Sequence, residues 1–428
     1  MKKPFPLFES LKVFRKQYTH GSFDSSDVTG YALLHEHDLQ QYISDLNYSS
    51  EFLYEYSKKS EATYNRFRNE IERFLLWSLL IAEKSVVDLK RVDIDEYIDF
   101  FWSPPASWMG TKIVSRMECK KGKCKLNKKW RPFVAKVSKT QRSLASEQDK
   151  EIKVDKKDYQ PSIESLKACF VALNAFYEFL MLEEYTEGNP VKVSKKRCPY
   201  FVEDTTSKDV MRLTDLQWDV IVDTAEKIAH ENSRYERHLF LVMAVKALKL
   251  RISELGVRKS TRSDDIEWTP VFGHFYINKE YWVLKVFGKG RKTREVTVPD
   301  ALLPYLDRYR EHLGLLGRPT KGEKQPIIGK ERGSGGMTAR HLTRLIQVVF
   351  DKAVDILNTE GHRDQANELR AASTHWLRHT QASQEVTAGR PLKHISDDLG
   401  HASLKTTDEE YVQSDLRERG ESARKTII

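Results

Sequence analysis

The seven residues THWLRHT (374–380) place His375 and Arg378 three positions apart. On a helix, residues with this spacing lie on the same face. An imidazole, which can carry a proton, would then stand beside a guanidinium, which can hold two oxygens of an anion at once. Taken alone, the pair is equally consistent with an ordinary surface contact, so its meaning depends on the rest of the chain.

Three further stretches carry side chains suited to the same chemistry. They are LRISELG with Arg251, FGKGRKTREV with Lys289 between two glycines, and LGHASLKTTDEEY with His401. Each has an ordinary explanation by itself: an arginine at a helix end, a lysine at a hairpin tip, and a buried or capping histidine. Together, two arginines, a lysine and two histidines match the spread negative charge of a phosphoryl group during transfer.

Such a set still needs a nucleophile, and Tyr411 is the only tyrosine after Tyr309. It follows His401 by ten residues, on a predicted terminal helix. A tyrosine that attacks a phosphodiester splits the reaction into two steps and stores the bond energy in a covalent intermediate. Because guanidinium groups supply the positive charge, we predict that the reaction uses no metal and no cofactor.

Cys119 and Cys124 raise the alternative of a zinc site, but their spacing is loose and no second pair follows, so free thiols are favoured. The N-terminus lacks the apolar segment of a secretory signal, and no apolar run reaches about 18 residues. We therefore expect a cytoplasmic protein without membrane contact.

The formal charge of this 428-residue chain is +9, and the charge is concentrated in one segment. Residues 112–142 hold twelve Lys and Arg against one acid, Glu118, so this segment carries +11 and the remainder −2. A basic block of this kind is typical of nucleic-acid contact, with a solvated insertion as the alternative. The side chains predicted to contact DNA are Lys120, Lys121, Lys123, Lys125, Lys128, Lys129 and Arg131.

Hydrophobic spacing predicts a mainly α fold with a small antiparallel sheet, the strands lying at 275–299. Asp93 is a plausible helix cap, and Thr214 with Gln217 forms a capping box. The expected segments are an N-terminal arm or leader (1–45), a helical domain (46–195) with a basic insertion (about 103–158), a linker (196–210), and a second domain with a C-terminal tail (211–428).

The four motifs LRISEL, GKG on a hairpin, HWLRH and LGHASLKTT…Y, in this order, resemble the tyrosine recombinase family, also called phage integrase-like recombinases. The resemblance covers about 210–415. It implies an α+β catalytic domain behind a helical core-binding domain, a double-stranded DNA recombination site as partner, a homotetramer on DNA, and accessory proteins in some systems. The short tail after Tyr411 could then dock on a neighbouring protomer.

The resemblance also implies a role for each motif residue. Arg251 and Arg378 would hold the non-bridging oxygens of the scissile phosphate, and Lys289 would protonate the departing 5′ hydroxyl. His375 would assist proton transfer, and His401 would hydrogen-bond the phosphate. Tyr411 would form a 3′-phosphotyrosyl link, with Glu254 supporting the site from behind.

Two positions depart from the family pattern. The first motif usually has glycine where this chain has Lys249, and the tyrosine usually follows the last histidine by nine residues instead of ten. A helix turns by about 100° per residue, so the extra residue would misdirect Tyr411 unless the connecting loop absorbs it. We expect the loop to do so.

The predicted function is therefore that of a site-specific recombinase that integrates, excises or resolves a mobile element or replicon. One alternative is a DNA-binding protein on the same scaffold with weak or no catalysis. Another is an enzyme similar to type IB topoisomerases, which share the chemistry.

Overall fold

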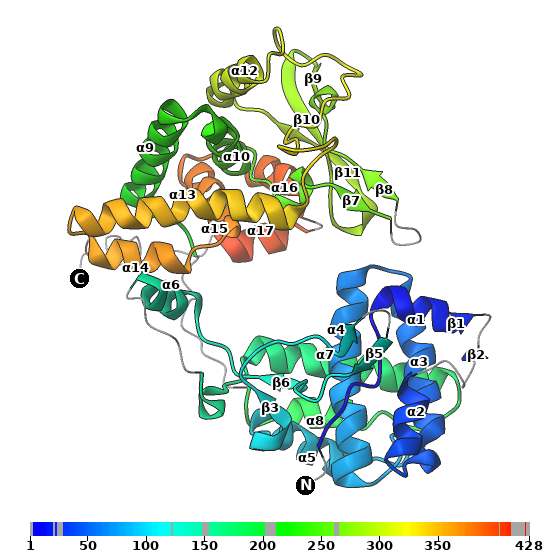
Figure 1. Cartoon of the computed structure of the whole chain (residues 1–428). Coiled ribbons are helices and arrows are strands. Elements are labelled where there is room, and N and C mark those ends of the chain that lie inside the picture. Colours follow the sequence, from blue (N-terminus) through cyan, green and yellow to red (C-terminus); the bar gives the residue numbers. More distant parts are fainter. Residues whose placement is uncertain are drawn as a thin grey trace. The chain divides into compact units, whose positions relative to one another are not determined.

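The computed structural model describes residues 3–19, 22–23, 29–120, 123–147, 154–201, 211–260, 265–401, 403–411 and 424. The chain forms two compact units, Met1–Asp204 and Thr205–Ile428, each with its own hydrophobic core (Figure 1). Helices dominate both units and the strands are short, which confirms the predicted fold class. The boundary falls within the predicted linker, of which 202–210 lie outside the described residues.

The first unit is built from helices joined by short strand pairs. The helices are α1 (Leu11–Gln17), α2 (Thr29–Glu36), α3 (Ile43–Ser57), α4 (Glu61–Trp77), α5 (Arg91–Trp102), α6 (Lys139–Glu147), α7 (Ile163–Leu182) and α8 (Val191–Arg197). The strands are β1 (Tyr18–Thr19), β2 (Ser22–Phe23), β3 (Met109–Gly110), β4 (Met117–Lys120), β5 (Lys123–Leu126) and β6 (Phe133–Val134).

Helices α4 and α7 supply much of the core of this unit. The hydroxyl of Ser60 caps α4 by accepting from the Thr63 N–H at 3.0 Å, and the helix buries one apolar face. Helix α7 is long and apolar enough to cross a membrane by length and composition. Phe170, Leu173 and Phe176 of α7 are fully buried in this core, and a core helix passes the same test.

The predicted cap at Asp93 is wrong in position. Helix α5 begins at Arg91, so Asp93 lies in its first turn. There its carboxylate accepts from the Lys90 N–H at 2.7 Å and pairs with the Lys84 ammonium at 2.5 Å. A carboxylate in the first turn satisfies an otherwise unpaired backbone donor from inside the helix.

The described part of 1–45 shares the core of the first unit. Phe5, Phe8 and Phe14 are buried with the side chains of α3, α4 and α7. The carboxylate of Glu72 on α4 accepts from the backbone N–H groups of Leu7 and Phe8, at 2.8 and 3.1 Å. These aromatics therefore belong to the core of the first unit.

The basic segment 112–142 is tied to the same core. Its strands β4 and β5 pair as an antiparallel hairpin, and Trp130 and Phe133 beyond the hairpin are buried. Arg116 donates to Glu72 at 2.6 Å and lies over the ring of Trp130. Removing the whole segment would therefore open the core, so its charge must be tested by substitution.

The second unit combines a three-stranded antiparallel sheet with helices. The sheet has the order β11 (Thr293–Thr297), β10 (Tyr281–Phe287), β9 (Phe275–Asn278), and β7 (Arg258–Lys259) pairs separately with β8 (Ile266–Trp268). The helices are α9 (Asp215–Glu231), α10 (Glu236–Ala247), α11 (Ile252–Leu255), α12 (Leu303–His312), α13 (Ala339–Thr359), α14 (Arg363–Ala371), α15 (Thr374–Thr387), α16 (Leu392–Leu399) and α17 (Leu404–Tyr411).

Local signals in this unit agree with the sequence. Thr214 and Gln217 form the predicted capping box at the start of α9, and the predicted strands at 275–299 are β9, β10 and β11. Helix α10 is buried along most of its length and packs against α9, α12, α13 and α15. It thereby fixes the chain segment that follows it, which carries Arg251.

Candidate active site

Two of the predicted residues meet at one backbone carbonyl, that of Leu399 at the end of α16, and a third contacts one of them. Arg251 Nη1 donates to this oxygen at 3.2 Å, and Arg378 Nη2 donates to it at 2.7 Å. The same Arg378 nitrogen lies 3.2 Å from His401 Nε2. The first, third and fourth motifs, far apart in the sequence, therefore converge in the folded second unit.

Two backbone carbonyl oxygens fix the orientation of the Arg378 guanidinium. Its side chain is 2% exposed, and Nη1 donates to the carbonyl of Lys249 at 2.6 Å. Burial, and then the charge of Arg251, lowers the pKa of Arg378 to about 10. The guanidinium thus keeps its charge at neutral pH while its orientation is fixed by two carbonyls, as a preorganised anion site requires.

Glu254 is a buried carboxylate that contacts both Arg251 and Arg294. It accepts from the Arg251 N–H at 2.9 Å and from both terminal nitrogens of Arg294, at 2.6 and 3.0 Å. Burial alone would raise the pKa of this carboxyl, but the hydrogen bond and charge of Arg294 outweigh burial and leave it lowered. Glu254 is therefore an ionised carboxylate that neutralises part of the buried positive charge.

Arg294 was not assigned a role from the sequence, although it lies in the GKGRKTREV stretch. Besides Glu254 it binds the carbonyl of Asp398 at 2.9 Å. Gly400, with φ +65°, lies against this arginine, and a Cβ there would come within 2.9 Å of its side chain. The glycine of LGH thus allows α16 to approach β11 closely.

Lys289 lies in the turn Lys289–Arg291 between β10 and β11, and its side chain is outside the described part of the structure. The backbone places the turn near the site. A Cβ on the preceding Gly288 would lie 3.3 Å from Glu254 Oε1 and 3.2 Å from Arg294 Nη1. The hairpin therefore starts directly beside the carboxylate that supports Arg251.

Tyr411 ends α17 and points into the site. Its ring is buried against Ala382, Ile395 and Leu399 and stacks with the His401 ring at a centroid distance of 6.3 Å. Its hydroxyl lies 2.8 Å from Nδ1 of His379. The ten-residue spacing from His401 therefore leaves the phenol at the cluster, because α17 begins only at Leu404 after a short connection.

The histidines differ in environment. His375 is exposed, on the same helix as Arg378, with its ring centroid 6.3 Å from that of His379. His401 Nδ1 lies 2.9 Å from the Thr407 hydroxyl, and burial, followed by the charge of Arg378, lowers its pKa to about 4. Burial, followed by the charge of His375, lowers the pKa of His379 to about 4 as well.

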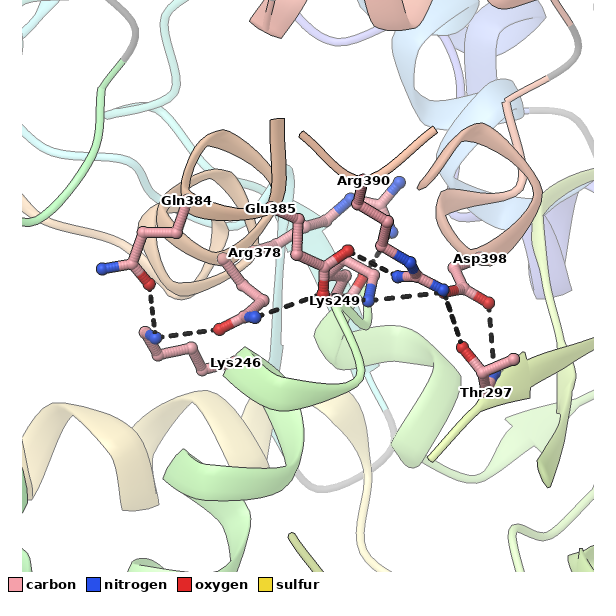
Figure 2. A network of polar contacts seen from close by, with 9 residues as sticks. Lys246, Lys249, Thr297, Arg378, Gln384, Glu385, Arg390 and Asp398 are labelled. Atoms are coloured by element: carbon pink, nitrogen blue, oxygen red, sulfur yellow. Dashed lines mark hydrogen bonds and ion pairs between the residues drawn. The ribbon is translucent and has the colours of Figure 1, made fainter. Parts of the chain in front are cut away.

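Lys249, where the family usually has glycine, has a left-handed backbone with φ +52°. This conformation favours glycine, which accounts for the family pattern. In this chain the side chain is 1% exposed, and its ammonium binds Glu385 at 2.8 Å and Asp398 at 3.4 Å. Arg390 pairs with both carboxylates and completes a buried network between α15, α16 and the turn before α11 (Figure 2).

The residues predicted to contact DNA lie in the first unit. Lys125, Lys128 and Lys129 are exposed, and Arg131 is half-buried and donates to backbone carbonyls of the same loop. Lys121 and the side chains of Lys120 and Lys123 lie outside the described part of the chain, as do the side chains of Cys119 and Cys124 and most of the tail after Tyr411.

Residues 211–418 match the family model described as the phage integrase family. The tyrosine recombinase XerC of Chlorobaculum parvum is 24% identical over 254 residues, which cover 57% of this chain and 67% of that protein. XerD of Oceanobacillus iheyensis is 24% identical over 251 residues, covering 59% and 72%.

A solved structure of the XerH site-specific recombinase, a post-cleavage complex with a palindromic difH substrate, shares the fold. Its TM-score is 0.53 at 15% identity, with 99% of both chains covered. The sequence matches indicate an enzyme that cleaves and rejoins DNA. Residues 211–418 form a phage integrase family domain, and the chain is similar to tyrosine recombinases.

Proposed function

We propose that this chain is a site-specific recombinase that cuts and rejoins double-stranded DNA through a 3′-phosphotyrosyl intermediate. The observation that carries the proposal is the position of the Tyr411 ring, stacked on His401, which in turn contacts Arg378. A phosphodiester bound by Arg251 and Arg378 would lie within reach of the phenol. This geometry supports a catalytic protein over a DNA-binding scaffold without chemistry.

The bond changes follow from the proposed roles. The Tyr411 oxygen attacks phosphorus while Arg251, Arg378 and His401 stabilise the charge on the non-bridging oxygens. The bond to the 5′ oxygen breaks, and Lys289 supplies the proton that this oxygen needs to leave. His375, exposed on the same helix face as Arg378, assists at the phosphate. Rejoining reverses these steps, so the bond energy is kept.

The proposed partner is a double-stranded recombination site, on which four copies of the chain assemble in the cytoplasm. The related XerH was captured on its difH substrate, which supports DNA of this kind as the ligand. The same assembly would serve to integrate, excise or resolve a mobile element or replicon.

Tyr411→Phe is expected to abolish covalent attachment to DNA, because it removes the nucleophilic hydroxyl. DNA affinity should stay within about twofold, because the packed ring remains. The substrates are duplexes that the chain itself enriches from a randomised pool, each nicked at one of several successive positions. They trap the intermediate when the short fragment with the free 5′ hydroxyl diffuses away. The adduct is measured by denaturing electrophoresis. Absence of any adduct with the unaltered chain on all nicked duplexes would contradict the proposal.

The exposed lysines of the basic segment are expected to contribute to binding through phosphates. Replacing Lys125, Lys128 and Lys129 with alanine should flatten the plot of log affinity against log salt by about 0.9 for each phosphate that the variant no longer neutralises. The matched control replaces Lys321, Lys324 and Lys352, exposed lysines of the second unit, and removes the same charge. Equal slopes for the two triple variants would show that the segment binds no phosphates of its own.

A further inference from the structure

The hydroxyl of Tyr411 lies within hydrogen-bonding distance of a base, the last histidine of HWLRH, to which the family resemblance gave no role. His379 Nδ1 lies 2.8 Å from the phenolic oxygen, and the two ring centroids are 5.4 Å apart. His379 follows Arg378 directly on α15, so the helix that holds the phosphate-binding arginine also positions this imidazole. A phenol has an ordinary pKa of about 10, so at neutral pH it must lose a proton to something as it attacks.

His379 is in a state that can receive that proton. It is half-buried, and its lowered pKa keeps the ring neutral at physiological pH. A neutral imidazole has one nitrogen that donates and one that accepts. With the ring proton on Nε2, the Nδ1 lone pair faces the phenol, and the hydrogen bond runs from Tyr411 to His379.

We propose that His379 Nδ1 is the general base that takes the phenolic proton of Tyr411 during attack on the phosphate. This inference rests on the proposed recombinase function. As the oxygen–phosphorus bond forms, the proton passes from Tyr411 to His379 and the 5′ oxygen leaves with the proton from Lys289. On rejoining, the imidazolium returns its proton to the departing phenolate, so the histidine ends neutral.

The charges around His379 make its basicity depend on bound DNA. Its own helix presents His375 and the Arg378 guanidinium, both of which disfavour a proton on it, and α17 presents Tyr411. His401 contacts the ring of the same tyrosine, at a centroid distance of 6.3 Å. A phosphodiester anion held by Arg378 offsets this positive charge, so it raises the pKa of His379. The base therefore becomes stronger when substrate is in place.

The test measures single-turnover adduct formation on the nicked duplexes selected by the chain. His379→Asn places an amide oxygen near the position of Nδ1, where it can accept the hydrogen bond but cannot hold the proton. We expect adduct formation to fall by about 10²- to 10⁴-fold in this variant and in His379→Ala, with DNA affinity unchanged. His362→Asn, an exposed histidine at the start of α14, is the matched control and should react like the unaltered chain.

The pH dependence separates a base from a merely structural residue. Without a base, Tyr411 must lose its proton to solvent before it attacks. The rate of the His379→Asn variant should therefore rise about tenfold per pH unit below the phenol pKa. The unaltered chain should have a flatter profile over the same range. A slow variant whose rate does not recover with pH would overturn the proposal, as would a rate equal to or above that of the unaltered chain. A variant that reacts faster than the unaltered chain would mean that the hydrogen bond from Tyr411 to His379 slows the attack.

A second measurement keeps the inference testable if a variant folds poorly. Nitrogen NMR of the unaltered chain should show His379 with Nδ1 unprotonated, and Tyr411→Phe should shift that resonance. A proton on Nδ1 would overturn the assignment. An unaltered chain that forms no adduct refutes the recombinase function itself, whereas a reactive chain with reactive His379 variants refutes only the role of His379.

Discussion

Arg378→Ala is expected to lower DNA cleavage by at least about a thousandfold, because one preorganised donor of an oxyanion site is commonly worth about 10²–10³ and this arginine offers two. Its guanidinium is buried, charged and fixed by the carbonyls of Lys249 and Leu399, so no solvent cation can replace it in the same orientation. Adduct formation on the nicked duplexes measures the loss, and binding to the intact duplex is measured in parallel.

The same substitution removes the Arg378 donor from two buried carbonyls, of which that of Leu399 keeps Arg251 as a donor. The loss at the Lys249 carbonyl should cost about 1–3 kcal/mol, so a stability control is needed. Arg310→Ala provides it. Arg310 is also buried, and it binds the carbonyl of Gly317 at 2.7 Å and the carboxylate of Glu323 at 2.8 Å, in the loop that follows α12. This variant should lose comparable stability but cleave normally per folded molecule. If Arg378→Ala loses binding as strongly as cleavage, the arginine has a structural role instead.

The residues that sequence reasoning found share one property: each lies in a short motif whose chemistry is visible locally. Arg378 and His375 follow from helical spacing, and Thr214 with Gln217 from a capping pattern that involves only one turn. Such signals depend on neighbours within about four positions, which is the range over which a helix brings side chains together.

The residues that it missed depend on tertiary contacts. Arg294 gains its place only because Glu254, 40 residues earlier, is buried opposite it. His379 resembles any histidine on a helix until α17 brings Tyr411 against it. The effect of Lys249 was likewise invisible, since its partners Glu385 and Asp398 lie more than a hundred residues further along the chain.

Substitution of Lys249 is expected to lower both stability and cleavage. Lys249→Ala keeps the strained backbone but removes the ammonium from Glu385 and Asp398. Breaking a buried ion pair by removing one partner typically costs about 3–5 kcal/mol. The cost here should fall at the low end, because Arg390 still pairs with both carboxylates and Thr297 donates to Asp398 through its N–H and its hydroxyl (Figure 2).

Lys249→Gly separates the backbone from the side chain. Glycine adopts positive φ without strain, so this variant should be about 1 kcal/mol more stable than Lys249→Ala, although both lack the ammonium. The carbonyl of residue 249 holds Arg378, so the alanine variant, with the strained turn no longer anchored, should also cleave more slowly than the glycine variant. Urea unfolding and single-turnover adduct formation measure the two effects, with the exposed Lys352→Ala as control. Equal stability of the alanine and glycine variants would show that the left-handed turn stores no strain. Unchanged cleavage in both would show that the network does not set the position of Arg378.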